Sequence, residues 1–225
     1  MQNQPPNIRL CVFDAYGTLF DVNSAARQAA AELGEKWAPL AELWRTKQLQ
    51  YTWLRALMGR HADFWQVTGD ALDFALESLR LRDDALRGRL MDLYLRLHAF
   101  PEVQRVLTRL KRTAILSNGA PRMLSAAAQN AGIEHLLDAI LSVEEVGIYK
   151  PHPSVYRLAI DRFHCQPRNV CFVSSNAWDA YAAKAFGFNV AWCNRARQLP
   201  ERLPEKPDWE IATLEQLPEV IGVAG

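Results

Sequence analysis

The chain has 225 residues, of which 49% are hydrophobic and 23% charged, a composition typical of a globular protein with one large or two modest domains. Its 26 lysines and arginines nearly balance its 25 aspartates and glutamates, which leaves no strong field to attract nucleic acid or a membrane surface. No apolar run approaches the roughly 20 residues that a membrane helix needs. We therefore expect neither nucleic acid nor a membrane as a partner.

The first residues, 1–6, lack the basic and apolar regions of a signal peptide. Four cysteines are scattered along the chain without CxxC or CxxH spacing, and three of them lie in or beside apolar runs. We interpret them as small, buried side chains of a cytoplasmic protein. They are Cys11, Cys165, Cys171 and Cys193.

The first predicted strand is the short apolar run Leu10–Phe13. Asp14 follows at its carboxyl end, and Gly17 lets the chain turn sharply just beyond it. An acid at the carboxyl end of a central strand lies where open α/β sheets bind their ligands. Asp14 is thus the first candidate site residue.

Four segments with helical periodicity come next, at 24–34, 40–58, 63–80 and 83–98. Strand-like runs then return near 113–116, 138–141, 169–173, 189–192 and 209–212, in alternation with helices that begin at Pro121, after Pro153 and at Ala177. This alternation predicts an α/β fold, a doubly wound, Rossmann-like parallel sheet with an inserted helical cap. We assign residues 1–19 and 99–225 to the core and 20–98 to the cap, with hinges near Phe20-Asp21 and at 98–101, where Pro101 can start the next helix.

Helix 40–58 has two faces of interest. One apolar stripe follows helical spacing through Leu40, Leu43 or Trp44, Lys47, Tyr51, Leu54 and Met58. A second face carries Arg45, Leu49 and Trp53. An arginine among large apolar groups is either packed along its stem with its head in water, engaged in a dimer contact, or directed into a crevice between cap and core.

Three further polar turns follow predicted strands or loops. Ser117-Asn118-Gly119 is either a plain turn or an anion site before the helix at Pro121. Lys150, between Gly147 and two prolines, is either a solvated surface residue or a site residue held in a constrained loop. The segment 174–179 contains helix-capping residues, and capping is compatible with catalysis. Together with the first turn, they are predicted to converge on one crevice formed by Asp14, Thr18, Ser117, Asn118, Lys150, Ser174, Asn176 and Asp179.

These four motifs, in this order and spacing, resemble those of the haloacid dehalogenase superfamily. Its many phosphatase members carry Asp-x-Asp-x-Thr at the first motif, and the second acid protonates the leaving oxygen. Here Tyr16 stands at that position, and a phenol with a reference pKa of about 10 cannot readily replace a carboxylic acid. Residues 14–21, 44–55 and 174–179 look more narrowly like the (S)-2-haloacid dehalogenases, with small departures at Ala15 and Gln50.

The resemblance implies hydrolytic dehalogenation of (S)-2-haloalkanoic acids to (R)-2-hydroxy acids, with inversion at C2 and an ester intermediate on Asp14. It implies catalytic roles for Asp14, Thr18, Lys150, Ser174, Asn176 and Asp179. It implies binding of the substrate carboxylate and the halide by Tyr16, Arg45, Ser117, Asn118 and Tyr156, beside an apolar wall of Leu49, Phe64 and Trp178. It also implies a homodimer.

We expect no cofactor and no metal, because Tyr16 and Ser175 stand where phosphatases of the superfamily place acids. Two alternatives remain at this stage. One is a magnesium-dependent phosphatase of the same fold, against which Tyr16 and the lone Asp179 argue. The other is a non-catalytic relative that serves as a binding protein, in which we would expect some residues of the constellation to be missing.

Overall fold

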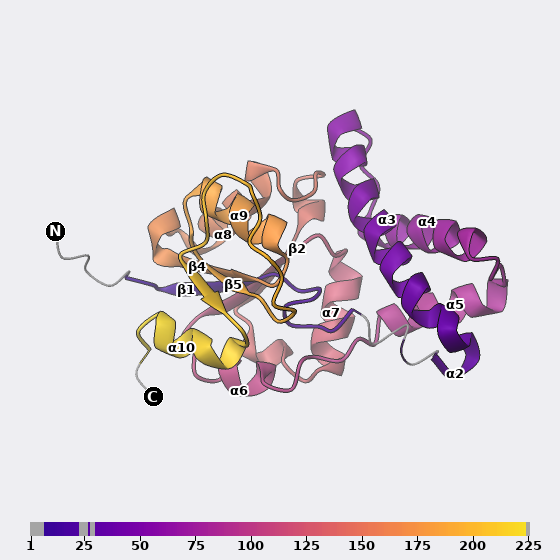
Figure 1. Cartoon of the computed structure of the whole chain (residues 1–225). Helices are drawn as coiled ribbons and strands as arrows, with labels where there is room; N and C mark the ends of the chain where they lie inside the picture. The colour runs from indigo at the N-terminus through magenta and orange to yellow at the C-terminus, as the bar shows by residue number, and fades with distance from the viewer. Residues whose placement is uncertain (1–6, 23–26, 28–29, 224–225) are drawn as a thin grey trace.

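Figure 1 shows the computed structural model of the chain, which describes residues 7–22, 27 and 30–223. Six strands form one sheet in the order β3-β2-β1-β4-β5-β6, and every neighbouring pair is parallel. This confirms the predicted doubly wound α/β fold, whose switch point lies between β1 and β4. The strands are β1 (Leu10–Phe13), β2 (Thr113–Ser117), β3 (Ala139–Ser142), β4 (Val170–Ser174), β5 (Asn189–Cys193) and β6 (Trp209–Ile211).

Helices cover both faces of the sheet (Figure 1). One face carries α6 (Val103–Leu107), α7 (Pro121–Asn130) and α10 (Leu217–Val220), and the other carries α8 (Pro153–Phe163) and α9 (Ala177–Phe186). Every residue of β1, β2 and β4 is buried, which explains their continuous apolar runs. Helices α7 and α8 begin at a proline, as expected, whereas α6 begins at Val103 because Pro101 lies in the preceding turn.

The inserted cap consists of α2 (Ala30–Leu33), α3 (Trp37–Met58), α4 (Phe64–Ser78) and α5 (Asp84–Tyr94). Aspartate side chains cap two of these helices: Asp63 accepts from the amide of Gln66 and Asp83 from that of Leu86. Gly59 ends α3 with a φ of +62°. The predicted helix 24–34 lies partly outside the described residues.

The apolar stripe noted on helix 40–58 is not the buried face of α3. The buried residues of this helix are Leu40, Trp44, Gln48 and Thr52, so the face that packs against α4 includes two polar side chains. Leu54 and Met58, which belong to the stripe, are 45% and 62% exposed. Spacing alone does not identify the buried face, because the buried positions that follow Leu40 and Trp44 along the helix are the polar residues Gln48 and Thr52.

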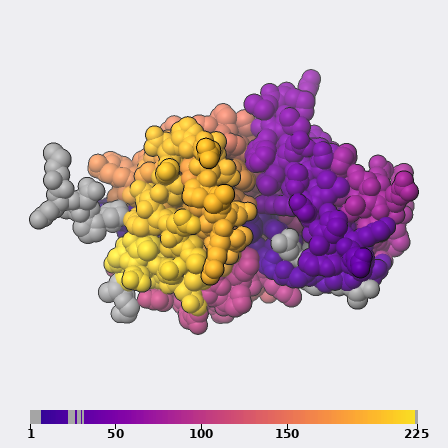
Figure 2. All heavy atoms as spheres, viewed as in Figure 1, coloured from indigo at the N-terminus to yellow at the C-terminus, as the bar shows by residue number. Residues whose placement is uncertain are grey.

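The chain enters and leaves the cap at one place. Phe20 and Ala99 form an antiparallel bridge, the amide of Asp21 donates to the His98 carbonyl and the amide of Phe100 donates to the Leu19 carbonyl, both at 2.9 Å. We propose the division into core and cap at these residues. Figure 2 shows the cap, in indigo and purple, against one side of the core.

The four cysteines are free, and Cys11, Cys171 and Cys193 are buried. Within the described residues, none of the helices combines the length and the apolar character that crossing a membrane would demand. Residues 1–6, to which the expectation about a signal peptide refers, lie outside the described residues.

Candidate active site

Asp14 lies directly after β1, at the carboxyl edge of the sheet and beside β4. Its backbone amide donates to the Val173 carbonyl at 2.9 Å, which extends the pairing of the two strands by one residue. Gly17 then adopts a φ of +88°, and the chain turns across the end of the strand. Asp14 is thereby fixed at the switch point of the sheet, with 6% of its surface exposed.

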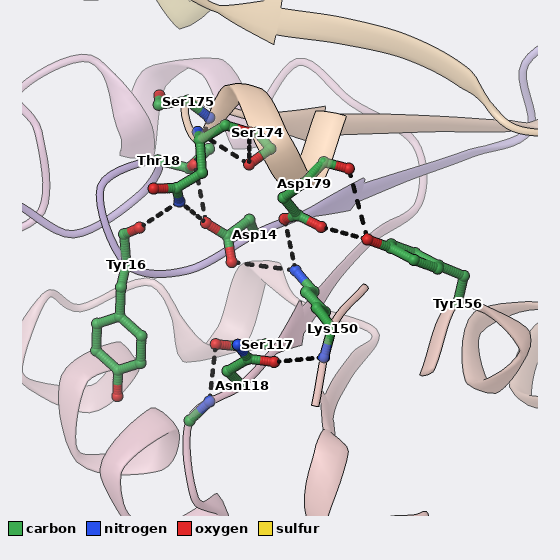
Figure 3. A network of polar contacts seen from close by, with 12 residues as sticks. Asp14, Tyr16, Thr18, Ser117, Asn118, Lys150, Tyr156, Ser174, Ser175 and Asp179 are labelled. Carbon is green, nitrogen blue, oxygen red and sulfur yellow. Dashed lines mark hydrogen bonds and ion pairs between the residues drawn. The ribbon is translucent and has the colours of Figure 1, made fainter. Parts of the chain in front are cut away.

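Lys150 joins two carboxylates from distant parts of the chain (Figure 3). Its Nζ lies 3.1 Å from Asp14 Oδ1 and 2.8 Å from Asp179 Oδ2. The loop that carries Lys150 is tied to the turn after β2, because its backbone amide donates to Asn118 Oδ1 at 3.0 Å. Three of the four predicted turns therefore contribute to one buried cluster of charges.

The second oxygen of Asp14 receives two further hydrogen bonds. Asn176 Nδ2 donates to Asp14 Oδ2 at 2.7 Å and also to the Tyr16 carbonyl at 3.0 Å. Thr18 Oγ1 accepts from the amide of Ser175 at 2.8 Å, so its hydrogen is directed to Asp14 Oδ2 at 3.3 Å. These bonds fix the orientation of the carboxylate.

Asp179 is the least solvated carboxyl of the cluster, with no surface exposed. Tyr156 donates to its Oδ1 at 2.7 Å. Desolvation by burial raises the pKa of Asp179 to about 6; Lys150 opposes that rise, and the Asp14 carboxylate adds to it. Asp179 is therefore largely ionised at neutral pH and becomes protonated as the pH falls through about 6.

Lys150 is charged. Desolvation by burial opposes the ammonium, but the Asp14 and Asp179 carboxylates outweigh it and raise the pKa of Lys150. Both Lys150 and Asp179 thus have raised pKa values for different reasons: two carboxylates stabilise the one ammonium, whereas burial and the Asp14 carboxylate disfavour the Asp179 carboxylate. The cluster carries a net charge of one minus when both acids are ionised.

Two predicted hydroxyls shape the turns that carry other site residues. Ser117 Oγ accepts from the amide of Gly119 at 3.1 Å, directly after β2. Ser174 Oγ accepts from the amide of Asn176 at 3.1 Å, so it orders the turn before α9. Ser174 was predicted to be catalytic, but its hydrogen bonds run to the Asn176 backbone.

The cap contributes Arg45, which points into the crevice. Its guanidinium donates to Asn176 Oδ1 at 3.3 Å and to Gln48 Oε1 at 2.8 Å. Of the alternatives that the sequence left open, the structure therefore selects the crevice. Leu49 lies half-buried one turn further along α3, and Trp178, also half-buried, packs edge-on against Trp53 at 5.4 Å between ring centroids.

Tyr16 packs among aromatic rings of the core and cap. Its ring lies 5.6 Å from that of Phe64 and 5.5 Å from that of Tyr94. Desolvation raises the pKa of Tyr16 well above its ordinary value, so the phenol is neutral. Its buried hydroxyl has no hydrogen-bond partner among the described residues. A Cβ on Gly119 would lie only 2.7 Å from the Tyr16 ring, so this glycine makes room for the phenol.

Sequence reasoning missed Gln48, Tyr94 and Gly119 as part of the site's surroundings. Gln48 had one usable signal, since it lies three residues after Arg45 and so shares its side of the helix. Gly119 was noted only for its flexibility, and no local pattern marks Tyr94.

No described group of three or more His, Cys, Asp or Glu side chains is arranged to hold a metal ion. Lys150 occupies the space between Asp14 and Asp179, where a cation would otherwise lie. An apolar cavity of about 560 Å³ lies next to the site, between cap and core. It is bordered by Trp53, Leu57, Pro151 and Trp178, and Asp14 is not part of its wall.

The sequence matches the family model of haloacid dehalogenase-like hydrolases over residues 8–187. (S)-2-haloacid dehalogenase 1 from Pseudomonas sp. (strain CBS-3) is 48% identical over 219 residues, covering 95% of this chain and 96% of the relative. A crystal structure of a dehalogenase with an intermediate complex superposes with a TM-score of 0.94 at 42% identity, covering 97% of this chain and 99% of the other.

The L-2-haloacid dehalogenase of Xanthobacter autotrophicus, in a structure with chloropropionic acid covalently bound, has a TM-score of 0.89 at 38% identity. The match covers 97% of this chain and the whole of the other, 100%. The similarity thus extends over core and cap together. The chain belongs to the haloacid dehalogenase-like hydrolases, and within them to the (S)-2-haloacid dehalogenases.

Proposed function

We propose that the chain hydrolyses (S)-2-haloalkanoic acids to (R)-2-hydroxy acids, with inversion at C2 and an ester intermediate on Asp14. The observation that carries the proposal is the bonding of Asp14: Thr18, Lys150 and Asn176 donate to its carboxylate, and only 6% of the surface of Asp14 is exposed. A fixed, poorly solvated carboxylate is a competent nucleophile toward carbon. The covalently bound chloropropionic acid in a related enzyme supports the same chemistry.

In the first step, an oxygen of Asp14 attacks C2 from the face opposite the halogen. The new C–O bond forms as the C–X bond breaks, and the halide leaves with the bonding electron pair. Negative charge therefore moves from Asp14 to the halide, and Arg45 and Asn118 are the polar groups that we assign to it. Their interaction strengthens in the transition state, which is what accelerates a reaction.

In the second step, Asp179 removes a proton from a water molecule that attacks the ester carbonyl of Asp14. The bond between this carbonyl carbon and the oxygen on C2, which Asp14 supplied in the first step, then breaks. That oxygen leaves as the hydroxyl of the hydroxy acid and takes the second proton of the water, while the water oxygen restores the Asp14 carboxylate. Lys150 and Asn176 hold the ester, and Tyr156 fixes the orientation of Asp179. A pKa of about 6 suits Asp179 to the role of a base near neutral pH.

We assign the remaining predicted residues to substrate binding. The Ser117 hydroxyl, Lys150 and the backbone amides after Asp14 bind the substrate carboxylate. Tyr16 and the apolar side chains of Leu49, Phe64 and Trp178 form the wall against the alkyl group. Ser174 acts by ordering the turn that carries Asn176.

We also propose that the reaction needs no metal or other cofactor, because the Lys150 ammonium already supplies the positive charge between the two carboxylates. The magnesium-dependent phosphatase alternative would need an acid two residues after Asp14, where Tyr16 stays neutral. A cytoplasmic homodimer remains our expectation, supported by the free cysteines and by the exposed Leu57 on the cap.

The deciding experiment measures halide release from each enantiomer of 2-chloropropanoate in the presence of EDTA, together with the configuration of the product. We expect chloride from the (S) form alone, with the (R)-hydroxy acid as product. Loss of activity with EDTA that magnesium restores, together with turnover of a phosphomonoester, would favour the phosphatase instead.

Asp14→Asn removes the nucleophile while keeping the size of the side chain. We expect no dehalogenation by this variant and a circular dichroism spectrum like that of the parent. Turnover by the folded variant would mean that another group attacks the substrate.

Asp179→Asn should separate the two steps, because it removes the proposed base and leaves Asp14 in place. We expect one equivalent of halide to be released and the ester to persist. Mass spectrometry of the peptide that contains Asp14 would detect the added mass of the substrate without its halogen. Multiple turnovers without accumulation of the ester would exclude Asp179 as the base.

A further inference from the structure

The side-chain amide of Gln48 is buried in the cap and contacts Arg45. Gln48 is 1% exposed, on the face of α3 that packs against α4. A primary amide removed from water is costly unless its oxygen and nitrogen are both hydrogen-bonded. In this chain both atoms are bonded, and the bonds lead from α4 to Arg45.

The direction of the Gln48 amide is fixed by Thr68. Thr68 Oγ1 donates its one hydrogen to the Phe64 carbonyl at 2.6 Å, so toward Gln48 it can only accept. Gln48 Nε2 therefore faces Thr68, at 2.8 Å, and Oε1 must face the other way. There Oε1 accepts from Arg45 Nη1 at 2.8 Å and from the Tyr94 hydroxyl at 3.2 Å.

Arg45 is consequently held by neutral oxygens on both sides. Gln48 Oε1 binds Nη1, and Asn176 Oδ1, from the core, binds Nη2 at 3.3 Å. No carboxylate among the described residues forms an ion pair with Arg45, so its charge is oriented without being neutralised. Asn176 also donates to Asp14, which sets the guanidinium beside the nucleophile.

We propose that Gln48 is a positioning residue for the first chemical step. Its neutral carbonyl directs the Arg45 guanidinium at the departing halide and leaves the full positive charge available to it. This inference rests on the proposed dehalogenase function. It predicts that a carboxylate at this position would be harmful even though it accepts the same hydrogen bonds, because it would compete with the halide for Arg45.

The test compares Gln48→Glu, which keeps the acceptor and adds a charge, with Gln48→Met, which keeps the approximate shape and removes the acceptor. Thr52→Val is the matched control: Thr52 is buried one turn further on the same face, and its hydroxyl donates to the Leu49 carbonyl at 2.7 Å, within its own helix. The rates of halide release and of ester hydrolysis are measured separately by rapid quench, and inhibition by added bromide is measured for each variant.

We expect Gln48→Glu to slow halide release and to raise the inhibition constant of bromide, each by roughly tenfold or more, while ester hydrolysis changes little. The loss should be larger for 2-chloropropanoate than for 2-bromopropanoate, because chloride is the poorer leaving group. Gln48→Met should show a smaller loss in the same step, and Thr52→Val should match the parent.

Equal slowing of both steps, or unchanged inhibition by bromide, would overturn the proposal and leave Gln48 with a purely structural role. If Gln48→Glu does not fold, Thr68→Val replaces it, since this variant frees the amide to rotate and should impair halide release alone. A parent enzyme that releases no halide from either enantiomer would overturn the proposed function and this inference together. A parent that dehalogenates, with insensitive variants, would overturn only the role of Gln48.

Discussion

Asp179 bears its charge in a site without exposure to water, between the Lys150 ammonium and the Tyr156 hydroxyl. Burial favours the protonated carboxyl, whereas the ammonium favours the carboxylate. The balance leaves the pKa at about 6, so the fraction of the base form changes steeply just below neutral pH. The Asp14 carboxylate contributes to this value, and it loses its charge while the ester exists.

The rate of ester hydrolysis should therefore fall by about tenfold for each pH unit below a pKa at or below about 6. The rate falls toward low pH because a general base acts only when it is ionised. In the ester, Asp14 has lost its charge, so one of the causes that raise the pKa of Asp179 is absent. Rapid-quench measurements of the ester across this pH range would test the expectation. A rate that stays constant down to about pH 4, the ordinary range of an aspartate, would mean that Asp179 does not act as the base.

At this scale the sequence predicts the residues that follow strand ends, because an apolar run and a polar turn are both visible locally. Asp14, Asn118 and Asn176 were located in this way. Gln48 and Tyr94 were not, since an amide and a phenol are ordinary residues of helices and acquire their roles only through contacts between α3, α4 and α5.

At the scale of secondary-structure elements, the turn between β2 and α7 packs closely against Tyr16, the residue whose ring contacts the cap. Gly119 lies under the Tyr16 ring, and a Cβ there would meet that ring at 2.7 Å and its hydroxyl oxygen at 2.9 Å. Ser142, at the end of β3, donates to the Gly119 carbonyl at 2.7 Å and restrains the turn from moving away. A larger residue must therefore displace Tyr16 toward the cap.

We expect Gly119→Ala to lower kcat/KM for (S)-2-chloropropanoate by about tenfold or more and stability by about 1–3 kcal/mol, because the displaced ring reshapes the pocket wall. Gly88→Ala is the control, since Gly88 is exposed on α5 with open space around it and should gain about 0.5–1 kcal/mol. Urea unfolding and steady-state kinetics measure both quantities. Normal activity of Gly119→Ala would mean that Tyr16 does not form the wall.

The strands were predictable because buried strands of a parallel sheet are continuous apolar runs. Leu10–Phe13 is such a run, and all four of its residues are buried. Helix α3 was predictable in extent but not in orientation. Its buried face ends in Gln48 and Thr52, whereas its exposed face ends in Leu57 and Met58, so hydrophobicity alone does not identify the buried side. The site itself requires polar residues at positions that a core would give to apolar ones.

For the whole molecule, the exposed apolar end of α3 is the feature that needs an explanation. Leu57 is 85% exposed and Met58 is 62% exposed, beside the apolar cavity between cap and core. Apolar patches of this kind on a folded protein commonly mark contacts with another protein. They support the expectation of a homodimer.

We expect the parent protein to sediment as a dimer and Leu57→Glu to shift it toward the monomer, since a charge buried at an apolar interface is costly. Gln104→Glu, at an exposed position of α6, adds the same charge elsewhere and should leave the dimer intact. Analytical ultracentrifugation would distinguish these states. A monomeric parent at micromolar concentration would contradict the expectation.

The antiparallel bridge between Phe20 and Ala99 brings together the two points where the chain enters and leaves the cap, so the cap can be removed without separating the ends of the core. The two ends of the cap leave the core as the two arms of a hairpin do, so a turn of a few residues has the right geometry to replace everything between them. None of the described residues of the excised segment forms a strand of the parallel sheet. The nucleophile and the base would stay on the sheet, while Arg45 would be lost. We therefore expect the fold of the core to depend little on the segment that joins Phe20 to Ala99, whereas every contact made by Arg45 depends on that segment.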